Sequence, residues 1–438
     1  MYSNKRICPD EYKASFEDLL KEYVNIFTED WLNSDTGHEI QKLWNRTDIL
    51  ASNELITLGV SIDKLKKVDP DWVKKQMNII KTCEPNGRRG ANYELILAAA
   101  LHNINGQTVD LLHPQTPTYD LILNLSTGCK ICISIKNFAH SKKSQEFEKE
   151  AKSIESMVKS NTQRAMQFII RNDNFPDSGD WISLRRFLVH ILKSDVNLND
   201  NYECQYTTSK WEIILKSINV DQCNLFGDKT SYTLFITTPF HKNEEMRLYT
   251  KLNKASKDLD KNGYPETNQS INILFVRIPS VIPLKNYVSW TYDYLRRNPG
   301  SSISGFILFQ PTVAYDENGS PFISLLHKVV LKPEIRANWF REKKRKCQFQ
   351  FPIGVFAQED YMTNLSINNK YICRCHYLYQ SGNIYVYYDI DELLKKQKRI
   401  TMHMKNTFGI HTHSIFKLGG QVGELSGNFP PNDELLLL

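Results

Sequence analysis

Three residues in the central part of the chain have the types and spacing that a metal-dependent phosphodiesterase requires. Glu94 lies in a segment rich in Ala and Leu, Asp120 is the second residue of an apolar run, and Lys136 lies near the end of another. Hydrolysis of a phosphodiester needs a hard divalent ion to neutralise the charge that grows on the phosphoryl oxygens. Mg²⁺ prefers oxygen ligands and keeps several waters, so one or two carboxylates and a backbone carbonyl can hold it.

Each residue has a distinct expected role in such a site. Asp120 is the principal metal ligand, Glu94 binds the other side of the ion or positions water, and the carbonyl of Ile135 is a third ligand. Lys136 orients or deprotonates the attacking water and stabilises the charge of the transition state. Mg²⁺ is the expected cofactor, with Mn²⁺ as a substitute. The alternative is that Glu94 is a solvated helix residue and that Lys136 reaches from a strand end to water.

A helix, three short strands and a second helix must position these residues. The predicted segments are a helix over 91–103, strands over 108–112, 119–125 and 130–138, and a charged helix over 141–159. Ser126, Thr127 and Gly128 form a tight turn between the second and third strands. Antiparallel pairing about this turn places Asp120 opposite Ser134.

The third strand alternates in a way that isolates its polar residues. Isoleucines at 131, 133 and 135 point to one face, and Cys132, Ser134 and Lys136 point to the other. This period of two is typical of a strand with one buried face. A lysine beside a polar serine in a core strand needs an explanation, and a chemical role supplies one.

These residues resemble the PD-(D/E)xK, or restriction-endonuclease-like, nuclease superfamily. The likeness rests on Glu94 in NYELILAAALHN, on Asp120 in TPTYDLILNL and on Ser134-Ile135-Lys136 in CISIKNF. It implies an αβββαβ core, dependence on Mg²⁺ and cleavage of nucleic-acid phosphodiesters. It covers only this central block directly, with the apolar strand over 232–239 as a candidate later core strand.

One position departs from the pattern of that superfamily. Ser134 stands where a second acid is expected, and a serine is a poorer ligand for Mg²⁺ than a carboxylate. Members of the superfamily can place this acid or an amide on the following helix. Gln145 and Glu148 are three residues apart and share a helix face, so they are the expected supporting residues. If neither reaches the site, the chain is a catalytically inactive nuclease-fold protein that acts as a nucleic-acid-binding or scaffold subunit.

Basic clusters supply candidate contacts to nucleic acid. Such clusters are often solvated faces, but in a nuclease they contact the phosphate backbone without reading its sequence. One pair directly precedes the predicted helix of Glu94, where the first backbone N–H groups favour a phosphate. The expected nucleic-acid-binding residues are Arg88, Arg89, Lys343, Lys344, Arg345 and Lys346.

Composition and motifs exclude several other classes of protein. The 438 residues carry a net charge of +6, which permits contact with nucleic acid. The longest apolar run is far shorter than the roughly 20 residues of a membrane span, and the first residues lack an export signal. We therefore expect a cytoplasmic protein with reduced cysteines and no membrane partner. Motifs of P-loop, HExxH and GxSxG enzymes are absent from the sequence.

The predicted fold class is α/β, in about three units for a chain of this length. They are a helical N-terminal region over 1–85, a nuclease-like core over 86–280 with a helical insertion near 162–228, and an α/β to β-rich C-terminal region over 281–438. Apolar strands that alternate with helices after residue 232 indicate α/β layering. The tail over 423–438 is expected to be loose or docked on a partner.

Two cysteine patterns are weaker candidates for metal sites. Cys129 and Cys132 have CxxC spacing, but on a strand they point to opposite faces. Cys373, Cys375 and His376 could bind zinc, although residues two apart on a strand more often form one packed face.

The chain is therefore expected to be a Mg²⁺-dependent endonuclease, a hydrolase that acts on DNA phosphodiester bonds in restriction or defence. Double-stranded DNA is the expected partner, and a homodimer is left open as its assembly. The C-terminal half would recognise the substrate or serve in assembly.

Overall fold

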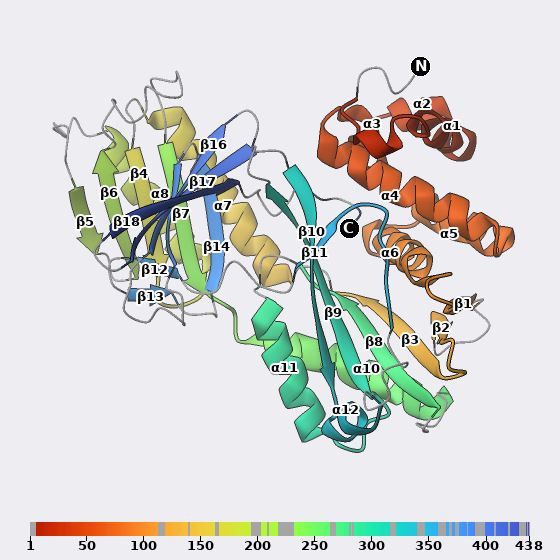
Figure 1. Cartoon of the computed structure of the whole chain (residues 1–438). Coiled ribbons are helices and arrows are strands. Elements are labelled where there is room, and N and C mark those ends of the chain that lie inside the picture. The colour runs from red at the N-terminus through yellow and green to blue at the C-terminus, as the bar shows by residue number, and fades with distance from the viewer. Residues whose placement is uncertain are drawn as a thin grey trace.

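The computed structural model contains helices and, over the residues that it describes, three sheets (Figure 1). The residues that it describes are 6–112, 119–138, 141–162, 166–193, 203–207, 210–217, 232–262, 269–279, 282, 284–315, 321–339, 347–357, 365–367, 370–372, 376–382, 384–389, 399–406, 409–418, 421–428, 435 and 437. Over these residues the fold is mixed α/β, in agreement with the predicted fold class. Within the same residues, no helix is both long and apolar enough to cross a membrane.

The N-terminal region is built of helices that pack through apolar residues three or four apart. The helical elements are η1 (Asp10–Tyr12), α1 (Phe16–Phe27), α2 (Glu29–Asn33), α3 (Glu39–Asn45), α4 (Ile49–Lys66), α5 (Pro70–Thr82) and α6 (Pro85–Leu101). Helix α1 ends at Phe27, and α2 begins two residues later at Glu29. Thr28 has φ +66° and caps α2 by accepting a hydrogen bond from the backbone N–H of Trp31.

Helix α6 begins earlier than the sequence predicts. The helix predicted over 91–103 starts at Pro85 instead, so Gly87 and Gly90 lie inside it. Proline favours the first turn of a helix because it lacks an N–H that would otherwise stay unpaired. Arg88 and Arg89 are thus helical residues rather than loop residues that precede the helix.

The central sheet carries the candidate site. Its strand order is β1-β2-β3-β8-β9-β10-β11. The strands are β1 (Thr108–Leu111), β2 (Leu121–Asn124), β3 (Lys130–Asn137), β8 (Ser270–Arg277), β9 (Gly305–Tyr315), β10 (Pro321–Leu331) and β11 (Val355–Ala357). Strands β1, β2 and β3 are antiparallel neighbours, and β8 lies parallel to β3 on its other side. Gly128, with φ +80°, makes the turn between β2 and β3.

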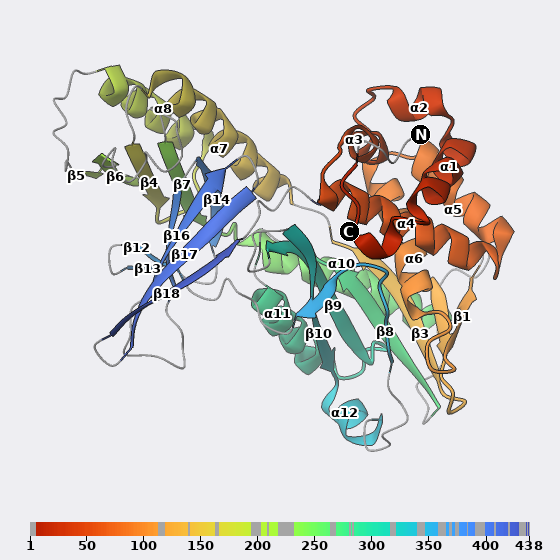
Figure 2. The ribbon, with the colours of Figure 1, turned by 45° about the horizontal axis from the view of Figure 1, so that its top comes forward.

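Helices cover both faces of the central sheet (Figures 1 and 2). The N-terminal helices pack on the face of Ile131, Ile133 and Ile135. On the opposite face, Cys132 packs with α10 (Asn243–Asn262) and α11 (Leu284–Arg297). The predicted alternation of β3 is confirmed, but the expectation of one buried face is wrong, because Cys132 and Ser134 are buried as well. A strand between two helical layers has no solvent face. Helix α12 (Pro333–Trp339) follows β10.

The residues between β3 and α10 form a second α/β unit rather than the helical insertion predicted near 162–228. Its elements are α7 (Lys142–Asn161), β4 (Met166–Asn172), α8 (Ser178–Lys193), β5 (Glu203–Thr207), β6 (Trp211–Ser217) and β7 (Tyr232–Pro239). Its sheet, the side sheet, has the order β14-β7-β4-β6-β5, with β14 (His376–Gly382) from the C-terminal region. Apolar residues of β4, β6 and β7 pack there against Trp181 and Phe147.

This unit changes which strand completes the central sheet. We expected Tyr232–Pro239 as a later strand of the core, but β7 pairs with β4 and β14 in the side sheet. The neighbour of β3 is instead β8, in a register that pairs Lys130 with Ser270. The chain leaves the central sheet after β3 and returns to it through α10.

The C-terminal region forms a third sheet with the order β13-β12-β15-β16-β17-β18. Its strands are β12 (Leu365–Ile367), β13 (Lys370–Ile372), β15 (Ile384–Asp389), β16 (Arg399–Asn406), β17 (Gly409–Leu418) and β18 (Gln421–Asn428). The tail, which we expected to be loose or docked on a partner, contacts its own chain. Leu437 is buried in the apolar core of the N-terminal helices, and its N–H donates to Glu54 of α4 at 2.6 Å.

Candidate active site

Asp120 lies directly before β2, where groups of β3 converge on one of its oxygens. The β2–β3 register pairs Leu121 with Ile133, which confirms that Asp120 lies opposite Ser134. The backbone N–H of Ile135 donates to Asp120 Oδ2 at 2.5 Å, and Ser134 Oγ donates to the same atom at 3.3 Å. Lys136 Nζ lies 3.9 Å from Asp120 Oδ2. Asp120, Ser134 and Lys136 therefore come together as predicted.

Glu94 approaches this group from the helix side. It lies on α6, and Gln76 of α5 donates to its Oε2 at 3.1 Å. Burial raises the pKa of Glu94 to about 7, and the negative charge of Asp120 is the second cause of this rise. The hydrogen bond from Gln76 and the positive charge of Lys136 lower the pKa, but by less. The structure thus brings Glu94 within electrostatic reach of Asp120.

Among the described residues, each of the two carboxylates, Asp120 and Glu94, has one oxygen without a hydrogen-bond donor. The contacts of Asp120 fall on Oδ2, and the hydrogen bond to Glu94 falls on Oε2. Over the residues that the structure describes, Asp120 Oδ1 and Glu94 Oε1 have no hydrogen-bond donor. Two carboxylates that are held by one oxygen and open at the other suit a hard cation, which prefers oxygen ligands.

The donor set fits Mg²⁺ better than a metal that needs several side-chain ligands. Within the described part of the chain, no group of three or more His, Cys, Asp or Glu residues is placed to hold a metal ion. An ion at this site would have Glu94, Asp120 and a backbone oxygen such as that of Ile135, with water in its other positions. Mg²⁺ is commonly bound in this way. Burial and, after it, repulsion by Asp120 raise the pKa of Glu94, and a divalent charge would relieve the repulsion.

Ser134 orients Asp120 instead of supplying a second carboxylate on the strand. Its side chain is buried, with 4% of the residue exposed, and its hydroxyl points to Asp120. A buried hydroxyl of this kind restricts the rotation of the carboxylate that it contacts.

The supporting residues predicted on the next helix have other surroundings. Helix α7 packs through Phe147 and Ala151 into the core of the side sheet, not onto β3. Glu148 forms an ion pair with Lys152 at 2.7 Å, and Gln145 is exposed. The charges that act on Glu94 are those of Asp120 and Lys136 and do not include Glu148. The helix that packs beside β3 is α10, because the second unit separates α7 from the central sheet.

The arginines predicted to bind nucleic acid are engaged within the protein. Arg88 Nε lies 2.7 Å from a carboxylate oxygen of Glu39, and Arg89 lies 3.2 Å from the other oxygen. Glu39 is buried, so the two cations neutralise a charge that would otherwise be costly. Arg88 is therefore a structural residue here. The basic run with Lys343, Lys344, Arg345 and Lys346 lies outside the described residues.

The cysteine patterns do not form a metal centre in the described residues. Cys129 packs in the core on one face of the central sheet and Cys132 in the core on the other, as their spacing predicts. Burial raises the pKa of the Cys132 thiol to about 11, which keeps it protonated. Cys373 and Cys375 lie outside the described residues.

Sequence reasoning missed two contributors to this region. Gln76 bonds to Glu94 from α5, and no local pattern distinguishes it from other polar residues of that helix. Lys251 of α10 is the other, and the positive charge of Lys136 is one of the causes that lower its pKa. Its spacing of four from Arg247, on one side of a charged helix, was the available signal, but it matters only once α10 is known to pack beside β3.

Comparison of the chain with protein-family models, with curated proteins and with solved structures finds no match.

Proposed function

We propose that the chain is a Mg²⁺-dependent endonuclease that hydrolyses DNA phosphodiester bonds at the site of Glu94, Asp120 and Lys136. The observation that carries the proposal is the convergence on Asp120. A backbone N–H and the Ser134 hydroxyl fix one oxygen of this carboxylate, a lysine lies beside it, and the other oxygen is open.

The order of elements around the site supports the same proposal. Helix α6 is followed by the antiparallel strands β1, β2 and β3, and the chain returns through α10 to β8, parallel to β3. This order supports the αβββαβ core that the resemblance implies, if the second unit is taken as an insertion between its third strand and second helix. A fold is shared by many functions, so the argument for function rests on the site.

The residues divide the chemical work in a simple way. Bound Mg²⁺ would supply Lewis-acid stabilisation of charge on the phosphoryl oxygens. Asp120 and Glu94 would hold it through their open oxygens, and Ser134 and Ile135 keep Asp120 in place. The Lys136 ammonium lies on the same side as Asp120 Oδ2, where it can orient a water and stabilise negative charge as it develops.

A second candidate is a catalytically inactive nuclease-fold protein that binds nucleic acid or acts as a scaffold subunit. The observation that favours it is Ser134, which removes the second strand carboxylate, while Glu148 is paired with Lys152. The two candidates share Asp120 and Lys136, so the presence of these residues does not distinguish them. A cleavage assay does, because only the endonuclease cuts DNA.

The test is incubation with plasmid, linear duplex DNA and RNA, in Mg²⁺ or Mn²⁺, with EDTA as a control. We expect metal-dependent cleavage of DNA that is lost in Asp120→Asn, which keeps the size and an acceptor oxygen but not the charge. Asp110→Asn is the matched control, because Asp110 is an exposed carboxylate of neighbouring β1 that accepts from Asn124. No cleavage by the wild type in either metal rejects the endonuclease, and DNA binding without cleavage then supports the inactive form.

A further inference from the structure

The segment that follows β3 carries two cations on one aromatic ring. Phe138 is buried, and its N–H donates to the carbonyl of Arg277 at 2.8 Å, which ties it to β8. From α10, Arg247 Cζ and Lys251 Nζ each lie 4.8 Å from the centre of the Phe138 ring. The edge of Tyr287 packs on the same ring. Cations within about 6 Å of a ring centre are attracted to its π face, so Phe138 fixes the position of both.

Arg247, Lys136 and Lys251 differ in whether a nearby carboxylate offsets their positive charge. Arg247 lies 3.4 Å from a carboxylate oxygen of Glu244, and Lys136 lies 3.9 Å from Asp120. For Lys251, the described residues include no carboxylate partner. Lys251 as a residue is exposed, but its ammonium group loses part of its hydration against the protein. This desolvation, with the like charges of Arg247 and Lys136, lowers the pKa of Lys251.

A cluster of positively charged side chains of this kind favours the binding of an anion. Lys251 is held on the Phe138 ring near the charges of Arg247 and Lys136, and no carboxylate among the described residues pairs with it. Clustered positive charge raises the local concentration of anions, and a lysine ammonium binds phosphate as a point charge. Lys136 lies beside Asp120, and the Phe138 ring that holds Lys251 follows Lys136 by two residues, so the anion would lie next to the group that is cleaved.

We propose that Lys251, together with Lys136, binds a backbone phosphate of DNA adjacent to the scissile phosphodiester. The inference rests on the proposed function, from which it takes DNA as the ligand. It assigns to α10 the anchoring of the substrate strand, a role that sequence analysis gave to Arg88 and Arg89. Phe138 is a positioning residue in this scheme, because it acts by holding Lys251.

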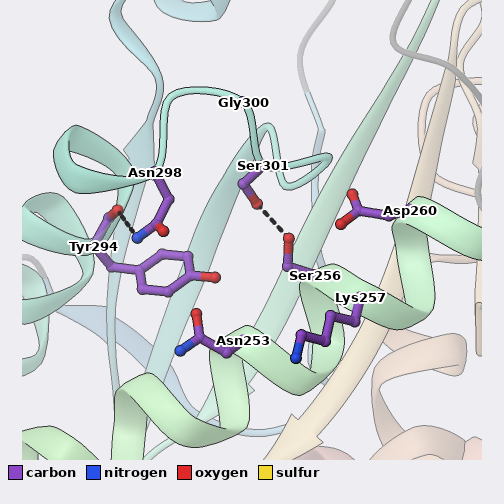
Figure 3. A pocket seen from close by; sticks show the side chains of 8 residues that line it. All are labelled: Asn253, Ser256, Lys257, Asp260, Tyr294, Asn298, Gly300 and Ser301. Atoms are coloured by element: carbon purple, nitrogen blue, oxygen red, sulfur yellow. Dashed lines mark hydrogen bonds between the residues drawn. The ribbon is translucent and has the colours of Figure 1, made fainter.

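Lys257, which lines a polar hollow on another side of α10, is the matched control for Lys251. This hollow has a volume of about 300 Å³ and is lined by Lys257 and residues near Gly300 (Figure 3). Two of its polar residues, Ser256 and Ser301, are hydrogen-bonded to each other at 2.8 Å. Lys257 is exposed on the same helix, six residues and about 120° away from Lys251. Its removal changes the charge of α10 equally at a different place.

The experiment measures binding of a short DNA duplex by fluorescence anisotropy over a range of salt concentrations, in EDTA so that cleavage does not interfere. In Lys251→Ala we expect about fivefold to tenfold weaker binding at low salt. The slope of log K against log salt should fall by about 0.9, the value for one lost phosphate contact. Lys251→Arg, which keeps the charge, and Lys257→Ala should both retain the wild-type slope. Lys251→Met keeps the apolar stem over Phe138, and it replaces the alanine variant if that variant does not fold.

The outcomes separate this inference from the proposed function. A wild-type slope and affinity in folded Lys251→Ala or Lys251→Met overturns the inference, even if the wild type cleaves DNA. An equal loss in Lys257→Ala also overturns it, because the effect would then be one of general charge. A selective loss in the Lys251 variants supports it, and if the wild type does not cleave, only the endonuclease proposal fails. Absence of DNA binding by the wild type overturns this inference, and the cleavage assay in Mg²⁺ or Mn²⁺ then decides the endonuclease proposal by itself.

Discussion

The backbone N–H of Ile135 donates to Oδ2 of Asp120 at 2.5 Å, so the strand that carries Lys136 also fixes the carboxylate opposite it. A rotation of Asp120 would cost this hydrogen bond and the one from Ser134, and a shift of β3 would move Lys136 as well. Preorganised charged groups of this kind need little rearrangement during reaction. The hairpin between β2 and β3 is therefore the unit on which the candidate chemistry depends.

Replacement of Lys136 by Met should lower the cleavage rate by about a hundredfold or more, because a positioned general acid–base group typically contributes about 10²–10⁴ in rate. The variant keeps the length of the side chain. We expect its folding and its Mg²⁺ requirement to change little, since Lys136 is not a proposed ligand. Single-turnover cleavage at saturating enzyme measures the rate directly. A rate within about threefold of the wild type would remove Lys136 from the mechanism.

Glu94→Gln should stabilise the protein at alkaline pH when metal is absent. The pKa of Glu94 rises from an ordinary 4.5 to about 7 in the folded chain. The unfolded chain therefore loses its proton first, and stability falls as pH rises from about 4.5 to 7. Above that range the full cost remains, about 3 kcal/mol, and Gln removes it. Urea denaturation in EDTA at pH 5 and pH 8 measures the difference.

The control for this prediction is Glu11→Gln, an exposed carboxylate outside the site. It should leave the free energy of unfolding nearly unchanged at both values of pH. A Glu94→Gln variant that is no more stable than the wild type at pH 8 would show that Glu94 ionises without strain, and the electrostatic account of the site would be wrong.

The local geometry of the site could be predicted from the sequence because it is encoded within one hairpin. The turn ending at Gly128 and the alternation of β3 fix which residues face each other, and a register of two strands follows from them. The surroundings of the hairpin could not be predicted in this way. Helix α7 has an amphipathic pattern that is the same whichever sheet it covers, and nothing local indicates that α10 replaces it beside β3.

Ion pairs between residues far apart in the chain could not be predicted from the sequence either. Arg88 and Glu39 are 49 positions apart, and Arg88 alone resembles a phosphate-binding residue at a helix start. Only the folded chain shows that Glu39 of α3 is buried and pairs with a cation of α6. Ser134 presents the same difficulty in reverse, because its sequence position marks a missing acid while its hydrogen bond to Asp120 gives it a different role.

Leu437→Ala should destabilise the N-terminal helices by about 2–4 kcal/mol, as expected for truncation of a buried leucine. Leu437 is 3% exposed, and its N–H is bonded to buried Glu54. Thermal or urea unfolding measures the change. Leu435→Ala is the control and should cost less, because Leu435 is only partly buried. Equal stability of Leu437→Ala and the wild type would mean that the tail does not dock.

Ser134→Asp tests whether the site is limited by its missing acid. Ser134 is 4% exposed and contacts Asp120, so a carboxylate there places two like charges together away from water. In EDTA we expect a lower melting temperature than that of the wild type, because like charge and burial both disfavour ionisation. With Mg²⁺ the new carboxylate is an additional oxygen ligand, and the ion should raise the melting temperature of the variant more than that of the wild type.

The neutral variant Ser134→Asn separates charge from shape. It has nearly the size of Asp, so it should share any steric loss in EDTA but show no added response to Mg²⁺. Because a ligand stabilises only the state that it binds, a larger Mg²⁺ shift in Ser134→Asp alone locates the ion at Asp120. If Mg²⁺ shifts the wild type, Ser134→Asp and Ser134→Asn equally, the ion binds elsewhere. The open oxygens of Asp120 and Glu94 would then not be its ligands.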